Sequence, residues 1–166
     1  GFRYARIKVL SGNVDVKSIT SIPITSLYEQ KLQFQSSNKN VNKLIENTSW
    51  SQKANFIEVP TDCPQRDERL GWTGDAQLFS STACYFYNCE KFFIKYLKDL
   101  VSEQDVNGAI GHVSPDITRN GKTNDLRFIS EEEKINGFWS HKGATGWGDA
   151  IVIIPWTLYK HYGNIE

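Results

Sequence analysis

Hydrophobic and polar residues alternate at the start of the chain. Over residues 2–9 the apolar side chains fall alternately on two faces of an extended backbone, which predicts a strand. β-Branched residues continue over 14–25, and a further short extended segment is expected at 32–34. We therefore interpret residues 1–35 as the last strands of a β-rich domain, or as a connecting arm.

The hydrophobic pattern then changes to the helical period, and it predicts four helices, at residues 38–54, 74–87, 90–104 and 147–162. The third helix has the clearest apolar stripe, with residues at i, i+3, i+4, i+7 and i+8: Phe93, Tyr96, Leu97, Leu100 and Val101. Four helices joined by loops, with no strand between them, form antiparallel pairs in a bundle or in part of an α/α toroid.

A long irregular segment separates the third and fourth helices. Residues 108–146 contain six glycines and Pro115, and a single helical turn is expected there, at residues 130–134. Loops of this length are uncommon, and they are usually functional or mobile.

Between the first two helices, residues 59–77 concentrate charged and aromatic side chains. Two prolines and two glycines interrupt this central stretch, so most of it cannot be regular helix or strand. It holds four carboxylates, two arginines and one tryptophan: Asp62, Asp67, Glu68, Asp75, Arg66, Arg69 and Trp72. Loops of this composition, held by a scaffold, are typical of binding and catalytic sites.

Composition argues against several classes of partner. The 19 basic residues balance 19 acidic ones without a basic run, so nothing favours binding to nucleic acid or to an anionic membrane surface. The longest apolar run, residues 150–155, is far too short to span a bilayer. Cys63, Cys84 and Cys89 match no metal-ligand spacing, so we expect unpaired thiols, no metal and no cofactor.

Four segments carry a resemblance to a known family: V-P-T-D-C-P-Q-R-D-E-R-L-G-W-T-G-D-A-Q at 59–77, G-F-R-Y at 1–4, N-K-L-I-E-N-T-S-W-S-Q at 42–52 and G-W-G-D-A-I-V-I-I-P-W-T-L-Y at 146–159. They resemble α-L-rhamnosidases of glycoside hydrolase family 78. The resemblance implies a mainly α fold, a partial (α/α)6 barrel of antiparallel helix pairs, preceded by a short β segment. It places the C-terminal strands of a β-sandwich domain, or a linker, at 1–35, and the N-terminal part of the barrel catalytic domain at 36–166.

Enzymes of this family release terminal α-L-rhamnose from glycosides with inversion at the anomeric carbon. Such an enzyme needs a protonated carboxylic acid beside the leaving oxygen and a carboxylate base across the ring. By similarity to the family motif, Glu68 is the general acid. Neighbouring carboxylates should help Glu68 to hold its proton, whereas Arg66 and Arg69 act in the opposite direction. The structural alternative is a surface ion pair between Glu68 and Arg69.

The same motif implies which residues hold the sugar, so the expected partner is a rhamnose-containing glycoside or oligosaccharide. Asp62, Arg66 and Asp75 match positions that hydrogen-bond the rhamnose hydroxyls, and Trp72 and Trp147 match walls around the ring. Each residue also has a structural alternative. Asp62 suits a turn cap, Asp75 a helix cap, Arg66 the neutralisation of its neighbours, and either tryptophan the core.

The catalytic base has no candidate in this motif. In the family it is a glutamate much further along, and the acidic cluster at 131–133 matches nothing in the motif. We therefore expect the base beyond Glu166. The absence of methionine, even at position 1, suggests an excised fragment, which we expect to be inactive on its own.

Three other interpretations remain open at this point: an (α/α)6 glycosidase with a different sugar specificity, a non-catalytic carbohydrate-binding helical module, and a purely structural helical domain. A truncated barrel would expose apolar stripes on its helices. We therefore expect further chain, or a second copy in a homo-oligomer, to cover them.

Overall fold

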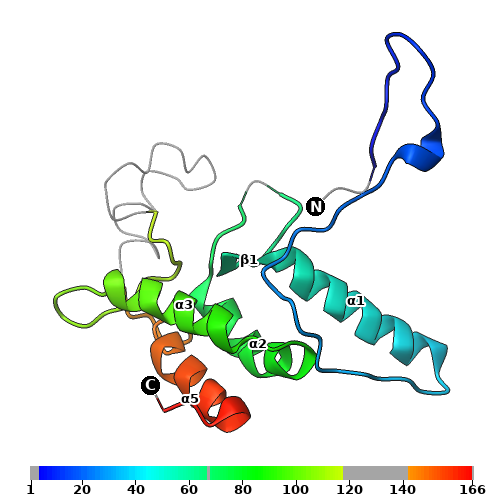
Figure 1. The fold of residues 1–166 in the computed structure, drawn as a ribbon. Helices are drawn as coiled ribbons and strands as arrows, with labels where there is room; N and C mark the ends of the chain where they lie inside the picture. Colours follow the sequence, from blue (N-terminus) through cyan, green and yellow to red (C-terminus); the bar gives the residue numbers. More distant parts are fainter. Residues whose placement is uncertain (1–3, 67, 118–141, 166) are drawn as a thin grey trace.

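The computed structural model describes residues 4–66, 68–117 and 142–165 and is mainly helical (Figure 1). The four predicted helices are confirmed, and the largest difference is at the start of the last one, at Ala150 instead of residue 147. The elements in chain order are η1 (Val16–Ser18), α1 (Lys39–Asn55), β1 (Phe56–Ile57), β2 (Val59–Pro60), α2 (Thr73–Phe86), α3 (Glu90–Ser102) and α5 (Ala150–Tyr162).

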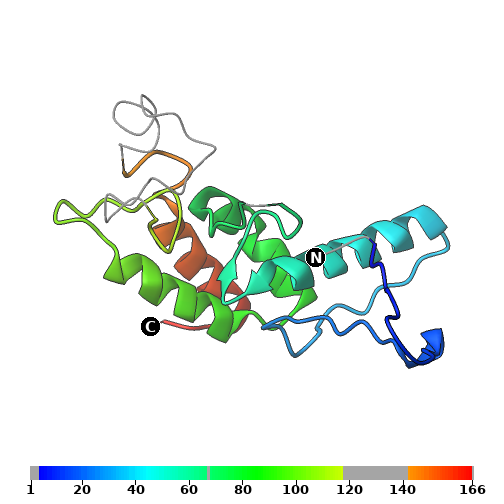
Figure 2. The ribbon, with the colours of Figure 1, turned by 90° about the horizontal axis from the view of Figure 1, so that it is seen from above.

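Helices α2, α3 and α5 form the body of the structure, and α5 packs against both of the others. These three helices are grouped together in Figure 1, while α1 extends to one side, and the view from above in Figure 2 agrees. Phe56 of β1 joins the core, where its ring stacks on Phe92 at a centroid distance of 4.5 Å. Other core residues are Ala83, Cys84, Phe93, Tyr96, Leu100, Ile154 and Leu158.

Capping residues explain where two helices begin and end. Asn38 accepts hydrogen bonds from the backbone N–H groups of Asn40 and Val41 at the start of α1, as its residue type predicts. Gly163 ends α5 with a φ of 69°, a left-handed conformation that glycine adopts at little cost. Pro155 lies inside α5, where its ring removes one backbone donor.

A short hairpin leads from α1 into the central stretch. Strands β1 and β2 pair antiparallel, with Phe56 opposite Pro60, and the residue between the strands, Glu58, has a φ of 64°. The chain therefore reverses sharply and returns to the end of α1. There the N–H and the hydroxyl of Thr61 both donate to the carbonyl of Asn55, each at 3.1 Å.

The strands predicted before residue 35 are wrong. Residues 4–34 contain no strand, and their only regular element is η1. A backbone with period-two alternation forms a strand only beside a partner, and in the described part of the chain none pairs with residues 4–24. The body holds only the last part of this region, because Leu27 is buried in the core and an isolated bridge joins Gln30 to Tyr87. The division of the chain into two domains at residue 35 stays a prediction.

The irregular segment after α3 is confirmed where the structure describes it, because residues 108–117 and 142–149 contain no helix. The helical turn expected at 130–134 and the acidic cluster at 131–133 lie outside the described residues. Among the described helices, none combines the length and the apolar character needed to cross a membrane.

Candidate active site

The acidic loop, residues 61–72, connects β2 to α2 and carries most of the predicted site residues. Its two ends are joined by backbone hydrogen bonds, since the N–H groups of Asp62 and Trp72 both donate to the carbonyl of Leu70, at 3.2 and 3.0 Å. This closure places Asp62 and Trp72 near the first turn of α2. Asp67 lies outside the described residues.

Arg66 draws three side chains of the acidic loop together. Its Nη2 atom lies 2.7 Å from Glu68 Oε2 and 3.5 Å from Asp62 Oδ2, and its Nε–H donates to the sulfur of Cys63 at 3.3 Å. The hydrogen bond to Cys63 and the charge of Glu68 raise the pKa of Arg66 above its ordinary value. The ion pair foreseen as the structural alternative for Glu68 is therefore present, but with Arg66 instead of Arg69.

Both oxygens of the Glu68 carboxylate have a partner. The indole N–H of Trp72 donates to Oε1 at 3.1 Å, and Arg66 contacts Oε2. The Glu68 side chain is 22% exposed, so it is largely enclosed but can still be reached from solvent. Glu68, Asp62 and Cys63 each place one polar atom within 4.8 Å of the others. The structure thus brings the predicted acid, Asp62, Arg66 and Trp72 into one cluster.

The same three atoms of Asp62, Cys63 and Glu68 are close enough together to share a metal ion. However, Arg66 already contacts both carboxylates with a positive charge, and the sulfur of Cys63 accepts a hydrogen bond from it. An arginine in this position satisfies the negative charges that a cation would otherwise balance. We therefore interpret the trio as an ion-pair cluster.

A cavity of about 370 Å³ lies beside the acidic loop. Asp62 Oδ1 is buried and has no hydrogen-bond partner among the residues that the structure describes. Burial raises the pKa of Asp75, and the charge of Asp62 raises it further, although a hydrogen bond from its own backbone N–H lowers it. Carboxylates of this kind can accept hydrogen bonds from ligand hydroxyls. The cavity is lined by Thr48, Ser51, Gln52, Asn55, Phe56, Pro60, Thr61, Asp62, Asp75, Ala76, Leu78 and Phe79.

Trp147 reaches this region from the irregular segment before α5. A Cβ atom on Gly74 would lie 3.0 Å from Trp147 Nε1 and 2.9 Å from the carbonyl oxygen of Gly146, so this tryptophan packs closely on the first turn of α2. Its ring also meets the ring of His112 edge to face, at 5.7 Å. Trp147 therefore lies beside the turn that carries Asp75.

Sequence reasoning missed the residues that hold the acidic loop from outside. The hydroxyl of Tyr96 donates to the carbonyl of Gly71 at 2.9 Å, and the N–H of Ser114 donates to the same oxygen at 2.9 Å. For Tyr96 a signal existed, because a tyrosine in a buried stripe needs a partner for its hydroxyl. For Ser114 there was none, because the contact joins segments that are distant in sequence. Cys63 is free and buried, as expected of an unpaired thiol, but its bond to Arg66 was not predicted.

Comparison with known proteins points to one family. A model of the bacterial α-L-rhamnosidase six-hairpin glycosidase domain matches residues 29–166. α-L-Rhamnosidases of Streptomyces avermitilis and Formosa agariphila are 36% and 33% identical to the chain, each over 99% of its length. The chain spans only 14% and 16% of the length of these two relatives.

Solved structures show the same similarity. The Streptomyces avermitilis α-L-rhamnosidase complexed with L-rhamnose aligns with a TM-score of 0.67 and 38% identity, over 84% of this chain and 12% of that one. The native α-L-rhamnosidase of Aspergillus terreus aligns with a TM-score of 0.74 and 41% identity, over 92% of this chain and 16% of that one. The chain therefore belongs to the family of bacterial α-L-rhamnosidase six-hairpin glycosidase domains.

Proposed function

We propose that the protein to which this chain belongs is an α-L-rhamnosidase that cleaves terminal rhamnosides with inversion, and that Glu68 is its general acid. One observation carries the proposal: the Glu68 carboxylate is held by Arg66 and Trp72 next to Asp62, which lines an open cavity. The names of the similar proteins, and the rhamnose complex of one of them, support the choice of sugar.

The chemistry requires Glu68 to carry a proton when the substrate is bound. As the bond from the anomeric carbon to the leaving oxygen breaks, Glu68 gives its proton to that oxygen, and a base activates water on the opposite face of the ring. In the free protein, Arg66 Nη2 contacts Glu68 Oε2 at 2.7 Å. The Arg66 side chain is 61% exposed, so it can turn to a substrate hydroxyl and leave Glu68 to take up a proton.

We assign the binding of the sugar to the residues around the cavity. Asp62 and Asp75 line the same space, and Asp62 Oδ1 is buried without a partner in the described part of the chain, so it can accept a hydroxyl hydrogen bond. Trp72, whose N–H is held by Glu68, offers a flat face to the apolar side of rhamnose. Trp147 is assigned to the same wall because it packs on Gly74, directly before Asp75.

The general base is assigned to a carboxylate beyond Glu166. Inverting enzymes place the base about 6.5–9.5 Å from the acid, to leave room for the attacking water. The neighbouring Asp62 has an oxygen within 4.8 Å of a Glu68 oxygen, which is closer than this spacing. Asp62 is therefore assigned to binding the sugar hydroxyls. The isolated chain should therefore release rhamnose slowly or not at all.

Glu68→Gln in the full-length protein tests the proposal. The amide cannot supply a proton, so hydrolysis of methyl α-L-rhamnoside should fall about 10²- to 10⁴-fold, while p-nitrophenyl α-L-rhamnoside, whose leaving group needs less protonation, should lose much less. The matched control is Glu46→Gln on α1, an exposed glutamate that pairs with Lys43, which should keep the wild-type rates. Wild-type rates in Glu68→Gln would contradict the role of Glu68 as the acid. An α-configured first product from the wild type would contradict the inversion.

Apolar side chains remain exposed on helices α1 and α5. Leu44 and Trp50 of α1, and Val152 and Trp156 of α5, are between 51% and 68% exposed. We propose that further helices of the domain, or a second copy of the chain, cover these faces. Gel filtration of the isolated chain should then show association, and a well-behaved monomer would count against it.

A further inference from the structure

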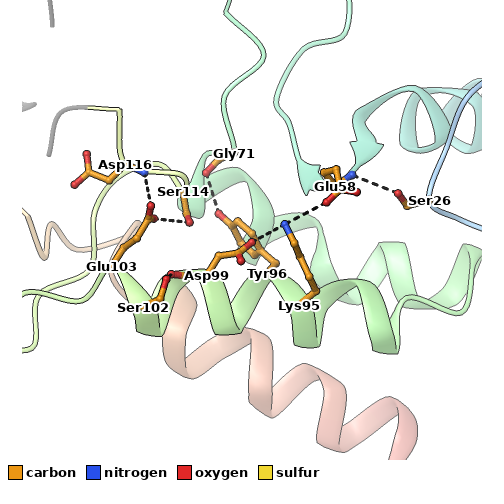
Figure 3. Close-up of polar contacts among 10 residues, drawn as sticks. All are labelled: Ser26, Glu58, Gly71, Lys95, Tyr96, Asp99, Ser102, Glu103, Ser114 and Asp116. Atoms are coloured by element: carbon orange, nitrogen blue, oxygen red, sulfur yellow. Dashed lines mark hydrogen bonds and ion pairs between the residues drawn. The ribbon is translucent and has the colours of Figure 1, made fainter. Parts of the chain in front are cut away.

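A tyrosine of α3 supports the acidic loop from within the core. Tyr96 has no exposed surface, and its hydroxyl donates to the carbonyl of Gly71 at 2.9 Å (Figure 3). Burial raises the pKa of Tyr96, and the charges of Glu103 and Asp99 raise it further. The phenol therefore stays protonated, and its hydroxyl acts as a permanent donor to the loop.

The same carbonyl is held from a second side. The N–H of Ser114 donates to it at 2.9 Å, and Ser114 is fixed in turn by its hydroxyl, which donates to Glu103 Oε2 at 2.7 Å. The other oxygen of Glu103 accepts the N–H of Asp116 at 3.0 Å, and these contacts lie together in Figure 3. Tyr96 on α3 and Glu103 at its C-terminal end thus hold one backbone carbonyl of the acidic loop from two directions.

The hydrogen bonds from Tyr96 and Ser114 form a clamp on the Gly71 carbonyl, and Gly71 cannot move freely within it. A Cβ atom at this position would lie 2.2 Å from the carbonyl oxygen of Ser114, so the two backbones are in direct contact. The next residue is Trp72, whose indole N–H holds Glu68 Oε1 at 3.1 Å. A change in the Gly71 peptide therefore changes the position of the indole, and with it the orientation of the carboxylate.

We propose that Tyr96 is a positioning residue for the general acid, acting through Gly71 and Trp72 to orient the Glu68 carboxylate towards the leaving oxygen. The inference rests on the proposed function, because it assumes that Glu68 is the proton donor. Tyr96 touches neither substrate nor reacting atoms in this scheme. Its removal should impair proton donation and leave sugar binding, through Asp62 and Asp75, largely intact.

Tyr96→Phe in the full-length protein provides the test, because it removes one hydroxyl and keeps the buried ring. The kcat for methyl α-L-rhamnoside, which has a poor leaving group, should fall about 10-fold, since small misplacement of a catalytic group costs this much or more. The kcat for p-nitrophenyl α-L-rhamnoside should change less than about 2-fold, and the KM for each of the two substrates should stay at its wild-type value. The matched control is Tyr85→Phe, an exposed tyrosine of α2, which should change neither rate.

The ratio of the two rates separates positioning from simple loss of structure. A variant that is only partly folded loses both activities equally, so an equal fall for both substrates would overturn the positioning role, as would unchanged rates. The melting temperature of Tyr96→Phe checks that the protein is folded. If the wild type cleaves a different aryl glycoside instead, the proposed sugar is wrong, and the same pair of leaving groups on that sugar tests Tyr96. A wild type that cleaves no glycoside would overturn both proposals.

Discussion

The acidic loop and the N-terminal segment, residues 4–24, both have irregular backbones, but the body of the protein holds them very differently. Every residue of the N-terminal segment is exposed. In the acidic loop, Cys63 is 5% exposed and the carbonyl of Gly71 accepts hydrogen bonds from Tyr96 and Ser114. Irregular backbone is therefore not loose backbone. What matters is whether its polar groups find partners in the core.

The two regions also differ in how they use charge. The acidic loop sets Arg66 between Asp62 and Glu68, so the negative side chains have a common partner. In the N-terminal segment the only described acid, Asp15, accepts a hydrogen bond from the N–H of Lys17 and begins η1. In the acidic loop the charged side chains form one cluster around Arg66, whereas Asp15 only caps the short helix η1.

The largest effect on stability is expected just after the N-terminal segment, where Leu27 enters the core. Leu27 is 5% exposed, so Leu27→Ala should lower the free energy of unfolding by about 3 kcal/mol through lost burial and a new cavity. Leu10, in the exposed part, is 84% exposed, and Leu10→Ala should change it by less than about 0.5 kcal/mol. Urea unfolding measures the free energy of unfolding of both variants. Equal losses in Leu27→Ala and Leu10→Ala would contradict the difference between the buried and the exposed position.

A smaller effect is expected from a methyl group added to the acidic loop. Gly71→Ala would push its Cβ into the carbonyl of Ser114, which should cost about 2 kcal/mol and lower rhamnoside turnover. Gly12→Ala is the matched change in the N-terminal segment. Gly12 has a φ of 75° but nothing within 4 Å, so the open segment can relax and activity should remain. The melting temperature and turnover of both variants test the comparison, and an active, stable Gly71→Ala protein would refute the clamp.

The smallest effect is a pH dependence within the site itself. Because burial raises the pKa of Asp75, the folded protein keeps this proton to higher pH than the unfolded chain, where the ordinary value is about 3.9. The folded state then binds more protons in that window, so Asp75 reduces stability as the pH rises through it. Asp75→Asn removes this contribution. Its melting temperature relative to wild type should therefore rise slightly as the pH increases above about 4, and a constant difference would contradict the raised pKa.

Local patterns predicted the helices well. The apolar stripe of α3 placed its start at Glu90 correctly and its end within two residues of Ser102. Asn38 and Gly163 are residue types that favour the cap positions they occupy, because capping depends on the residue's own backbone and the adjacent turn. The strand predicted over residues 2–9 is absent from its described part, residues 4–9, for the opposite reason. A strand depends on a partner, and its own alternation cannot supply one.

The sequence by itself determined the helices, the acidic loop between the first two of them and the family to which the chain belongs, because these are properties of composition, period and a contiguous motif. Only the tertiary structure decided that Arg66, and not Arg69, pairs with Glu68 and that Tyr96 and Ser114 meet at Gly71. Neighbours in a loop point in different directions, and contacts between distant segments form only when the helices pack. The orientation of the proposed acid is therefore a property of the fold, while its identity is a property of the chain.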